Sequence, residues 1–88
     1  MTQPDAPTIA AEILKQTASR GPERSICPSE VARALAPGED AWRRLMSSVR
    51  RVALSLAREG QVEVLRKGKP VDPAEEVRGV IRLRAAKP

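Results

Sequence analysis

One stretch, residues 40–60, constrains the fold more than any other part of this 88-residue sequence. Its apolar residues recur at steps of three and four, the spacing that places side chains on one face of an α-helix. They are Trp42, Leu45, Met46, Val49, Val52, Ala53 and Leu56. Asp40 is suited to cap the first turn, and Gly60 is suited to end the helix in a left-handed conformation. The pattern predicts one amphipathic helix about 30 Å long, enough to cross a small domain.

The opposite face of this predicted helix is basic. It carries Arg44, Ser47, Arg51 and Arg58. Residues 41–60 have a net charge of +4 and residues 61–88 of +3, whereas residues 1–40 have −2. Uneven charge of this kind favours a polyanionic partner such as nucleic acid, although a merely solvated surface has the same composition.

Two shorter helices are predicted ahead of the long one. The first runs from Pro7 or Thr8 to about Ala18, capped by Asp5 or Thr8, and an Arg-Gly-Pro sequence stops it. Its apolar face holds Ile9, Ile13, Leu14 and Thr17.

A turn joins the second helix to the long one. Cys27 ends a short, extended segment, because a residue before proline avoids helical dihedral angles. Pro28 begins the second helix, which is expected to bury Val31, Ala34 and Leu35. Residues 37–39, Pro-Gly-Glu, then form a short turn. A short helix, a tight turn with glycine and a longer basic helix are the pattern of a helix-turn-helix.

After the long helix, apolar residues alternate with polar ones, as in half-buried strands. Residues 61–64 are expected to form one strand, residues 70–71 a brief return strand, and residues 80–84 another strand with Ile81 and Leu83 inward. Between the first two lies a basic turn, Arg-Lys-Gly-Lys, at residues 66–69. The order predicts an α+β, mainly α fold: a winged helix-turn-helix of three helices plus a small antiparallel β-sheet, with the basic turn as its wing.

One domain is expected, at residues 7–84, with a flexible leader at residues 1–6 and a tail at residues 85–88. The sequence has no Phe or Tyr and one Trp, so the core is expected to be aliphatic. No apolar run approaches the ~20 residues of a membrane span, and the first residues lack the features of a signal peptide. The single cysteine fits a reducing compartment, so the expected location is the cytoplasm.

Four segments carry a resemblance to a known family. They are residues 28–35 (Pro-Ser-Glu-Val-Ala-Arg-Ala-Leu), the pairs Trp42-Arg43, Leu45-Met46 and Val49-Arg50, residues 66–73 (Arg-Lys-Gly-Lys-Pro-Val-Asp-Pro) and residues 79–83 (Gly-Val-Ile-Arg-Leu). Together they make residues 8–84 resemble a small bacterial winged-helix family catalogued only as a domain of unknown function. Val80 departs from the pattern, where proline is expected. The resemblance implies the fold and brings no activity with it.

Catalysis, a cofactor and a bound metal are not expected. Without histidine the chain cannot form the usual Ser-His or Cys-His nucleophile, and with one cysteine it cannot form a usual zinc site. No glycine-rich phosphate loop is present. Glu75 and Glu76 are interpreted as solvated loop residues, and Cys27 as a small buried hydrophobe in preference to a redox thiol.

The candidate nucleic-acid contacts lie on the long helix and the wing. They are Arg43, Arg44, Ser47, Arg50 and Arg51 on the helix, and Arg66, Lys67 and Lys69 on the wing. In helix-turn-helix docking the start of the second helix meets base edges, and wing tips contact phosphate. With almost no aromatic residues to stack on bases, the expected nucleic acid is double-stranded DNA.

A second function stays open: a protein-interaction module with an acidic partner and no DNA binding. Glu39 and Asp40 at the start of the helix, and two further acids after the wing, would repel phosphate. Arg33 on the second helix is expected to matter less to DNA than the arginines of the long helix. No spare apolar face suggests a dimer, so a monomer is expected.

Overall fold

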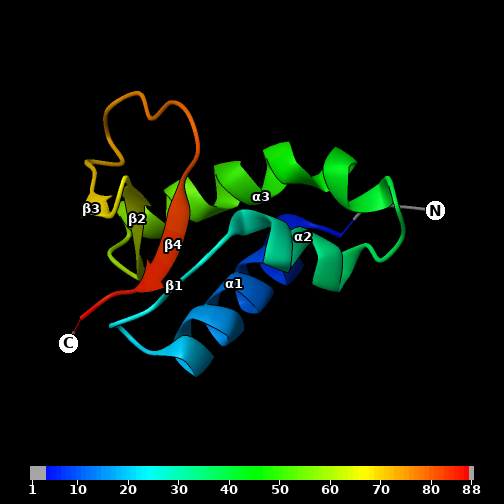
Figure 1. Ribbon diagram of the computed structural model, residues 1–88, viewed down its shortest axis with the longest axis horizontal. Coiled ribbons are helices and arrows are strands. Elements are labelled where there is room, and N and C mark those ends of the chain that lie inside the picture. The colour runs from blue at the N-terminus through cyan, green and yellow to red at the C-terminus, as the bar shows by residue number, and fades with distance from the viewer. Residues whose placement is uncertain (1–3, 88) are drawn as a thin grey trace.

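The computed structural model describes residues 4–87, which form three α-helices and one antiparallel sheet (Figure 1). In chain order the elements are α1 (Ala6–Arg20), β1 (Ser25–Ile26), α2 (Pro28–Leu35), α3 (Ala41–Arg58), β2 (Val62–Arg66), β3 (Lys69–Pro70) and β4 (Arg82–Ala85). The predicted class, α+β and mainly α, is confirmed, and the order of elements is consistent with a winged helix. Within residues 4–87 no helix has both the length and the apolarity to cross a membrane.

The sheet pairs the last strand of the domain with the first. Its strand order is β1-β4-β2-β3, and neighbouring strands are antiparallel. The last strand, β4, therefore lies between β1 and β2, with Leu83 opposite Ile26 on one side and Val64 on the other. Because side chains alternate along a strand, this register directs Leu83 toward the helices.

The basic turn predicted at residues 66–69 is a tight hairpin. Arg66 pairs with Lys69, so Lys67 and Gly68 alone form the loop. Their φ angles are 53° and 81°. Two consecutive residues with positive φ match the right-handed twist of the flanking strands, and glycine adopts such an angle without strain.

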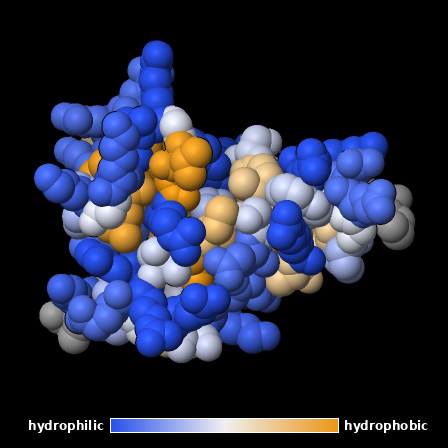
Figure 2. All heavy atoms as spheres, viewed as in Figure 1, coloured by the Kyte–Doolittle hydropathy of each residue, from blue (hydrophilic) through white to orange (hydrophobic). Residues whose placement is uncertain are grey.

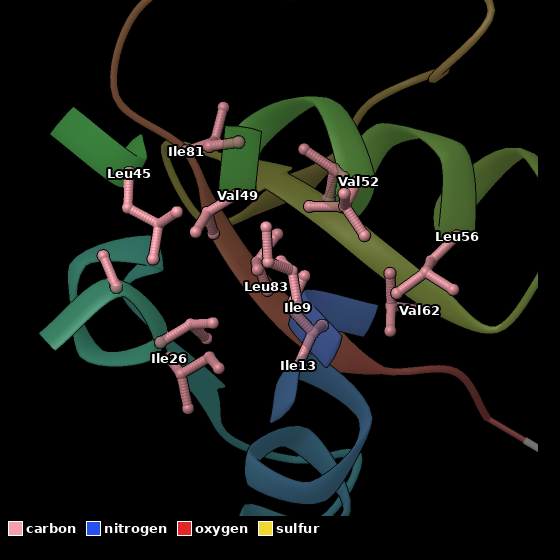
Figure 3. Close-up of a cluster of buried hydrophobic side chains, with 14 residues drawn as sticks. Ile9, Ile13, Ile26, Leu45, Val49, Val52, Leu56, Val62, Ile81 and Leu83 are labelled. Carbon is pink, nitrogen blue, oxygen red and sulfur yellow. The ribbon is translucent and has the colours of Figure 1, made fainter. Parts of the chain in front are cut away.

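The core of the described chain is aliphatic, as predicted. Its buried members come from all three helices, β1, β2, β4 and the residue before β4: Ile9, Ile13, Ile26, Val31, Ala32, Leu45, Val49, Val52, Ala53, Leu56, Val62, Val64, Ile81 and Leu83. Figure 3 shows side chains from α1, α3 and β4 converging on one another. Thr17 is the buried polar side chain of α1, and its hydroxyl donates to the Ile13 carbonyl at 2.9 Å. The apolar stripe of α3 is therefore the side that faces the core.

Two helix ends follow the sequence signals, and a third does so in part. The Asp5 carboxylate accepts from the Thr8 amide at 3.0 Å, and hydrogen bonding from the side chain and the backbone of Thr8 lowers the pKa of Asp5. At the end of α3, Gly60 has φ 79° and donates to Ala57, a glycine cap of the Schellman type. Asp40 occupies the cap position of α3, but its carboxylate makes no capping hydrogen bond within the described residues.

Two expectations about burial and strand bounds were wrong. In α2, Val31 is buried as predicted and Leu35 is partly buried, but Ala32 is buried in place of Ala34, which is exposed. Val80 is 83% exposed and lies before β4, which begins two residues later than predicted and extends through Ala85. Trp42, at the start of the apolar stripe, packs against the core but is only partly buried.

The structure shows regular elements at both predicted domain boundaries. Helix α1 includes Ala6, the last residue of the expected leader, and β4 includes Ala85, the first residue of the expected tail. The rest of the leader and tail includes residues 1–3 and 88, which lie outside the described residues.

Candidate nucleic-acid interface

Helix α3 carries a concentrated positive charge. Between Ala41 and Arg58 it has five arginines and no acidic residue. The ion pairs formed among residues 4–87 are Arg20–Glu30, Arg78–Glu76 and Arg84–Glu63. None of them involves a basic residue of α3 or of the β2–β3 hairpin, although Glu63 of β2 is the partner of Arg84. Within the described chain, therefore, no carboxylate neutralises the cations of these two elements through a direct ion pair.

Four of the predicted contacts lie exposed on α3. They are Arg43, Arg44, Ser47 and Arg51. Their spacing along the helix places them over its first three turns, away from the buried stripe. The α3 part of the predicted site is therefore accessible to a partner at these four positions.

Arg50, in contrast, binds the loop that joins β3 to β4. Its guanidinium donates to the Val77 carbonyl and, at 2.8 Å, to the Gly79 carbonyl. Arg58, about two helical turns further along, donates to the Pro73 carbonyl at 3.1 Å. Two of the five α3 arginines thus fasten residues 71–81 to the helix, and a partner could engage Arg50 only in competition with the loop.

We expect replacement of Arg50 by methionine to loosen this loop. Methionine keeps the aliphatic stem but loses both donors, and a hydrogen bond to a charged group contributes about 1.5–3 kcal/mol. Hydrogen exchange over residues 71–81 should become faster while exchange in β2 changes less. Arg51→Met is the matched control, because Arg51 is exposed and is not a donor to the loop. Equal loop exchange in both variants would contradict this role for Arg50.

The hairpin presents the rest of the predicted contacts. Lys67 and Lys69 are exposed at the turn. Arg66 is exposed too, but it leans over the loop: a Cβ built on Gly79 would lie 2.8 Å from a nitrogen of its guanidinium. Gly79 has φ 83°, which also favours glycine at that position. The backbone of Arg66 therefore belongs to the hairpin, while its guanidinium group lies against Gly79 of the loop.

The two basic areas lie far apart. Figure 1 shows the hairpin and the start of α3 toward opposite ends of the long axis, with the loop of residues 71–81 beside the last turns of α3. The longest extent of the described chain is 36 Å. The loop carries exposed Glu75 and Glu76, and Glu76 is paired with Arg78 at 2.9 Å. The basic surface is thus divided into a helical area and a hairpin area, and the acidic loop lies at the hairpin end of the molecule.

A depression next to the loop is lined mainly by apolar side chains. It measures about 310 Å³ and is lined by Cys27, Pro28, Met46, Ser47, Arg50, Gly79, Val80 and Ile81. Figure 2 shows apolar atoms gathered near the start of β4 and the middle of α3, on a face that is otherwise largely hydrophilic. The interpretation of Cys27 as a buried hydrophobe was wrong: it is partly exposed here, and its sulfur accepts from the Ser29 hydroxyl at 3.1 Å.

A family model matches almost the whole chain. Residues 6–86 match the model of the family described as "Protein of unknown function (DUF3253)". The chain belongs to the DUF3253 family. This confirms the resemblance drawn from the sequence and covers every element of the fold. No curated protein matches the chain.

DUF3253 membership supplies no activity, so the site rests on its own geometry. The feature that sequence reasoning missed is at Trp42. The guanidinium carbon of Arg33 lies 4.3 Å from the centre of the indole ring, and that of Arg43 lies 5.0 Å from it. A partial signal was present, since Trp42 and Arg43 are adjacent and α2 leads directly into α3. Contact with Arg33, nine residues earlier, depends on how the two helices cross.

Proposed function

We propose that this chain is a non-catalytic module that binds double-stranded DNA through the exposed side of α3 and the tip of the β2–β3 hairpin. The observation that supports it best is the charge of α3, where five arginines occur without one acid in the helix or one ion pair to the described chain. An 18-residue helix with such a face attracts a polyanion more strongly than an ordinary solvated surface, which mixes both signs.

The positions of the exposed side chains support duplex DNA over other polyanions. In helix-turn-helix docking, residues near the start of the second helix enter the major groove. Arg43, Arg44 and Ser47 lie in that part of α3. An arginine there can pair with guanine through two hydrogen bonds, and the serine can donate to a base or a phosphate.

The hairpin supplies contacts of a second kind. Lys67 and Lys69 are exposed beside Gly68, so the backbone at the turn can approach a phosphate closely. The described chain is 36 Å long, about the 34–36 Å of one helical turn of DNA. Both basic areas are therefore within reach of one turn of duplex.

The first experiment is a titration of labelled double-stranded DNA at several salt concentrations. Five exposed cations are available on α3 and the hairpin tip: Arg43, Arg44, Arg51, Lys67 and Lys69. With three to five of them neutralising phosphate, we expect a log–log salt slope of about −2.7 to −4.5, and a non-specific Kd of about 10⁻⁴–10⁻⁶ M at moderate salt. Absence of binding at low salt would contradict the proposal.

One observation favours the second candidate, a module that binds an acidic protein. Val80 is 83% exposed beside the apolar depression, and Arg50 and Ser47 lie at the same depression. An exposed apolar residue beside a cation suits a peptide that is both acidic and apolar better than it suits DNA. A protein partner bound there should be lost with Val80→Asp, whereas DNA binding through α3 should change far less.

A further inference from the structure

Trp42, Arg33 and Arg43 form a cluster that joins the two helices of the helix-turn-helix. Arg33 lies in the last turn of α2, and Arg43 lies in the first turns of α3. Their guanidinium carbons are 4.3 Å and 5.0 Å from the centre of the Trp42 ring. The indole is partly buried against the core, while both arginines are exposed. The ring is therefore a partly buried surface on which two exposed cations rest.

The cluster brings two like charges together with no direct ion pair to balance them. Neither arginine is in an ion pair within residues 4–87. Glu39 and Asp40 occur just before α3, yet neither comes within ion-pair distance of the two guanidinium groups. The attraction of each cation for the indole face offsets part of their repulsion. An anion placed between or beside the two guanidinium groups would offset the repulsion that remains.

Stacking also prepares the arginines for a phosphate. A guanidinium group is planar, is weakly hydrated and offers a fixed set of donors that matches phosphate oxygens. A free arginine loses side-chain entropy when it becomes ordered on a ligand, and an arginine already resting on a ring loses less. Trp42 therefore lowers the entropic cost of anion binding without contacting the anion.

The position of the cluster indicates which anion it meets. When a helix-turn-helix docks on DNA, the first helix crosses the backbone while the start of the second helix enters the major groove. Arg33 belongs to the first of these helices and Arg43 to the second. We infer that Arg33 and Arg43, held on Trp42, bind a backbone phosphate of double-stranded DNA at the junction of α2 and α3. This inference rests on the proposed function.

The inference changes the expected role of Arg33. Considered from the sequence, Arg33 should contribute less to DNA binding than the arginines of α3. In the structure it shares the indole with Arg43, so the two should act together, and Trp42 is a positioning residue for both.

The test compares the full chain with the double variant Arg33→Gln and Arg43→Gln on the same labelled duplex. Both side chains are exposed, so the fold should be retained. Losing this one phosphate contact should make the salt slope less steep by about 0.9 and weaken binding by about 8-fold near 0.1 M salt. Lys15→Gln with Arg24→Gln is the charge-matched control, because both of these residues are exposed on α1 or the turn after it. The control should keep the wild-type slope.

A second measurement uses the indole itself. Trp42 is the one tryptophan of a chain without tyrosine, so its emission reports this cluster alone. DNA should change that emission with the same Kd that the labelled duplex gives. Trp42→Phe should retain most of the affinity because it keeps a ring under the arginines, whereas Trp42→Leu should lose several-fold more.

The outcomes separate this inference from the proposed function. If the wild-type chain does not bind duplex DNA at low salt, both are overturned. If it binds, but the Arg33 and Arg43 variant keeps the wild-type slope and the emission stays constant at saturation, only the phosphate site is overturned. A slope reduced in that variant and not in the control supports the site.

Discussion

Leu83→Ala should remove most of the stability of this domain. Leu83 is fully buried at the centre of β4, where Ile26 and Val64 flank it on the neighbouring strands. Truncation of a buried leucine to alanine costs about 2–5 kcal/mol because it removes buried surface and leaves a cavity. A domain of this size buries a modest fraction of its surface, so its total is expected near the low end of about 5–15 kcal/mol. The midpoint of urea denaturation, followed by circular dichroism, measures the loss.

Val80→Ala is the control for this prediction. Val80 precedes β4 by two residues and is 83% exposed, so its truncation should change stability by no more than about 0.5 kcal/mol. Leu83→Ala and Val80→Ala are similar truncations only three residues apart. The two sites differ in burial and in position, because Leu83 lies in β4 and Val80 precedes it. Equal denaturation midpoints for the two variants would show that β4 does not anchor the core in solution.

The parts of the fold that sequence predicted well are those with strong periodicity. Helix α3 has five turns, so the helical spacing of its apolar residues is repeated often enough to identify the buried face. Gly60 was predictable because a left-handed cap strongly favours glycine. The same reasoning failed in α2, which has only eight residues. Both Ala32 and Ala34 are small and apolar there, and the packing of α2 against the other two helices decides which of them is buried.

The candidate site was harder to predict because its residues differ in contacts and not in type. Arg50 and Arg51 are adjacent and identical in chemistry, yet Arg50 donates to carbonyls of residues 77 and 79 while Arg51 is exposed. Backbone carbonyls carry no sequence signal, so nothing in the chain distinguishes these two arginines before folding. Trp42 posed the converse problem. Its place in the apolar stripe indicated burial, but the stripe ends at the junction with α2, where a wide ring can be covered on one side only.

The largest effect on function is expected from Arg44→Glu combined with Arg51→Glu. Both side chains are exposed on α3, on the side away from the buried stripe, so the substitutions should leave the fold intact. Each replaces a cation by an anion, which removes an attraction for phosphate and adds a repulsion. Two such reversals change the net charge from +5 to +1. We expect binding of duplex DNA to become undetectable at salt concentrations where the wild-type chain is saturated.

The control must change the net charge equally, because any cationic protein attracts DNA. Lys15→Glu with Arg24→Glu also gives a net charge of +1, but places the reversals on α1 and the turn that follows it. We expect this control to bind several-fold more weakly than wild type while retaining a measurable salt slope, since its α3 contacts are intact. Circular dichroism of both variants establishes that each is folded. Equal losses in the two variants would mean that DNA responds to overall charge and that α3 is not the surface that binds it.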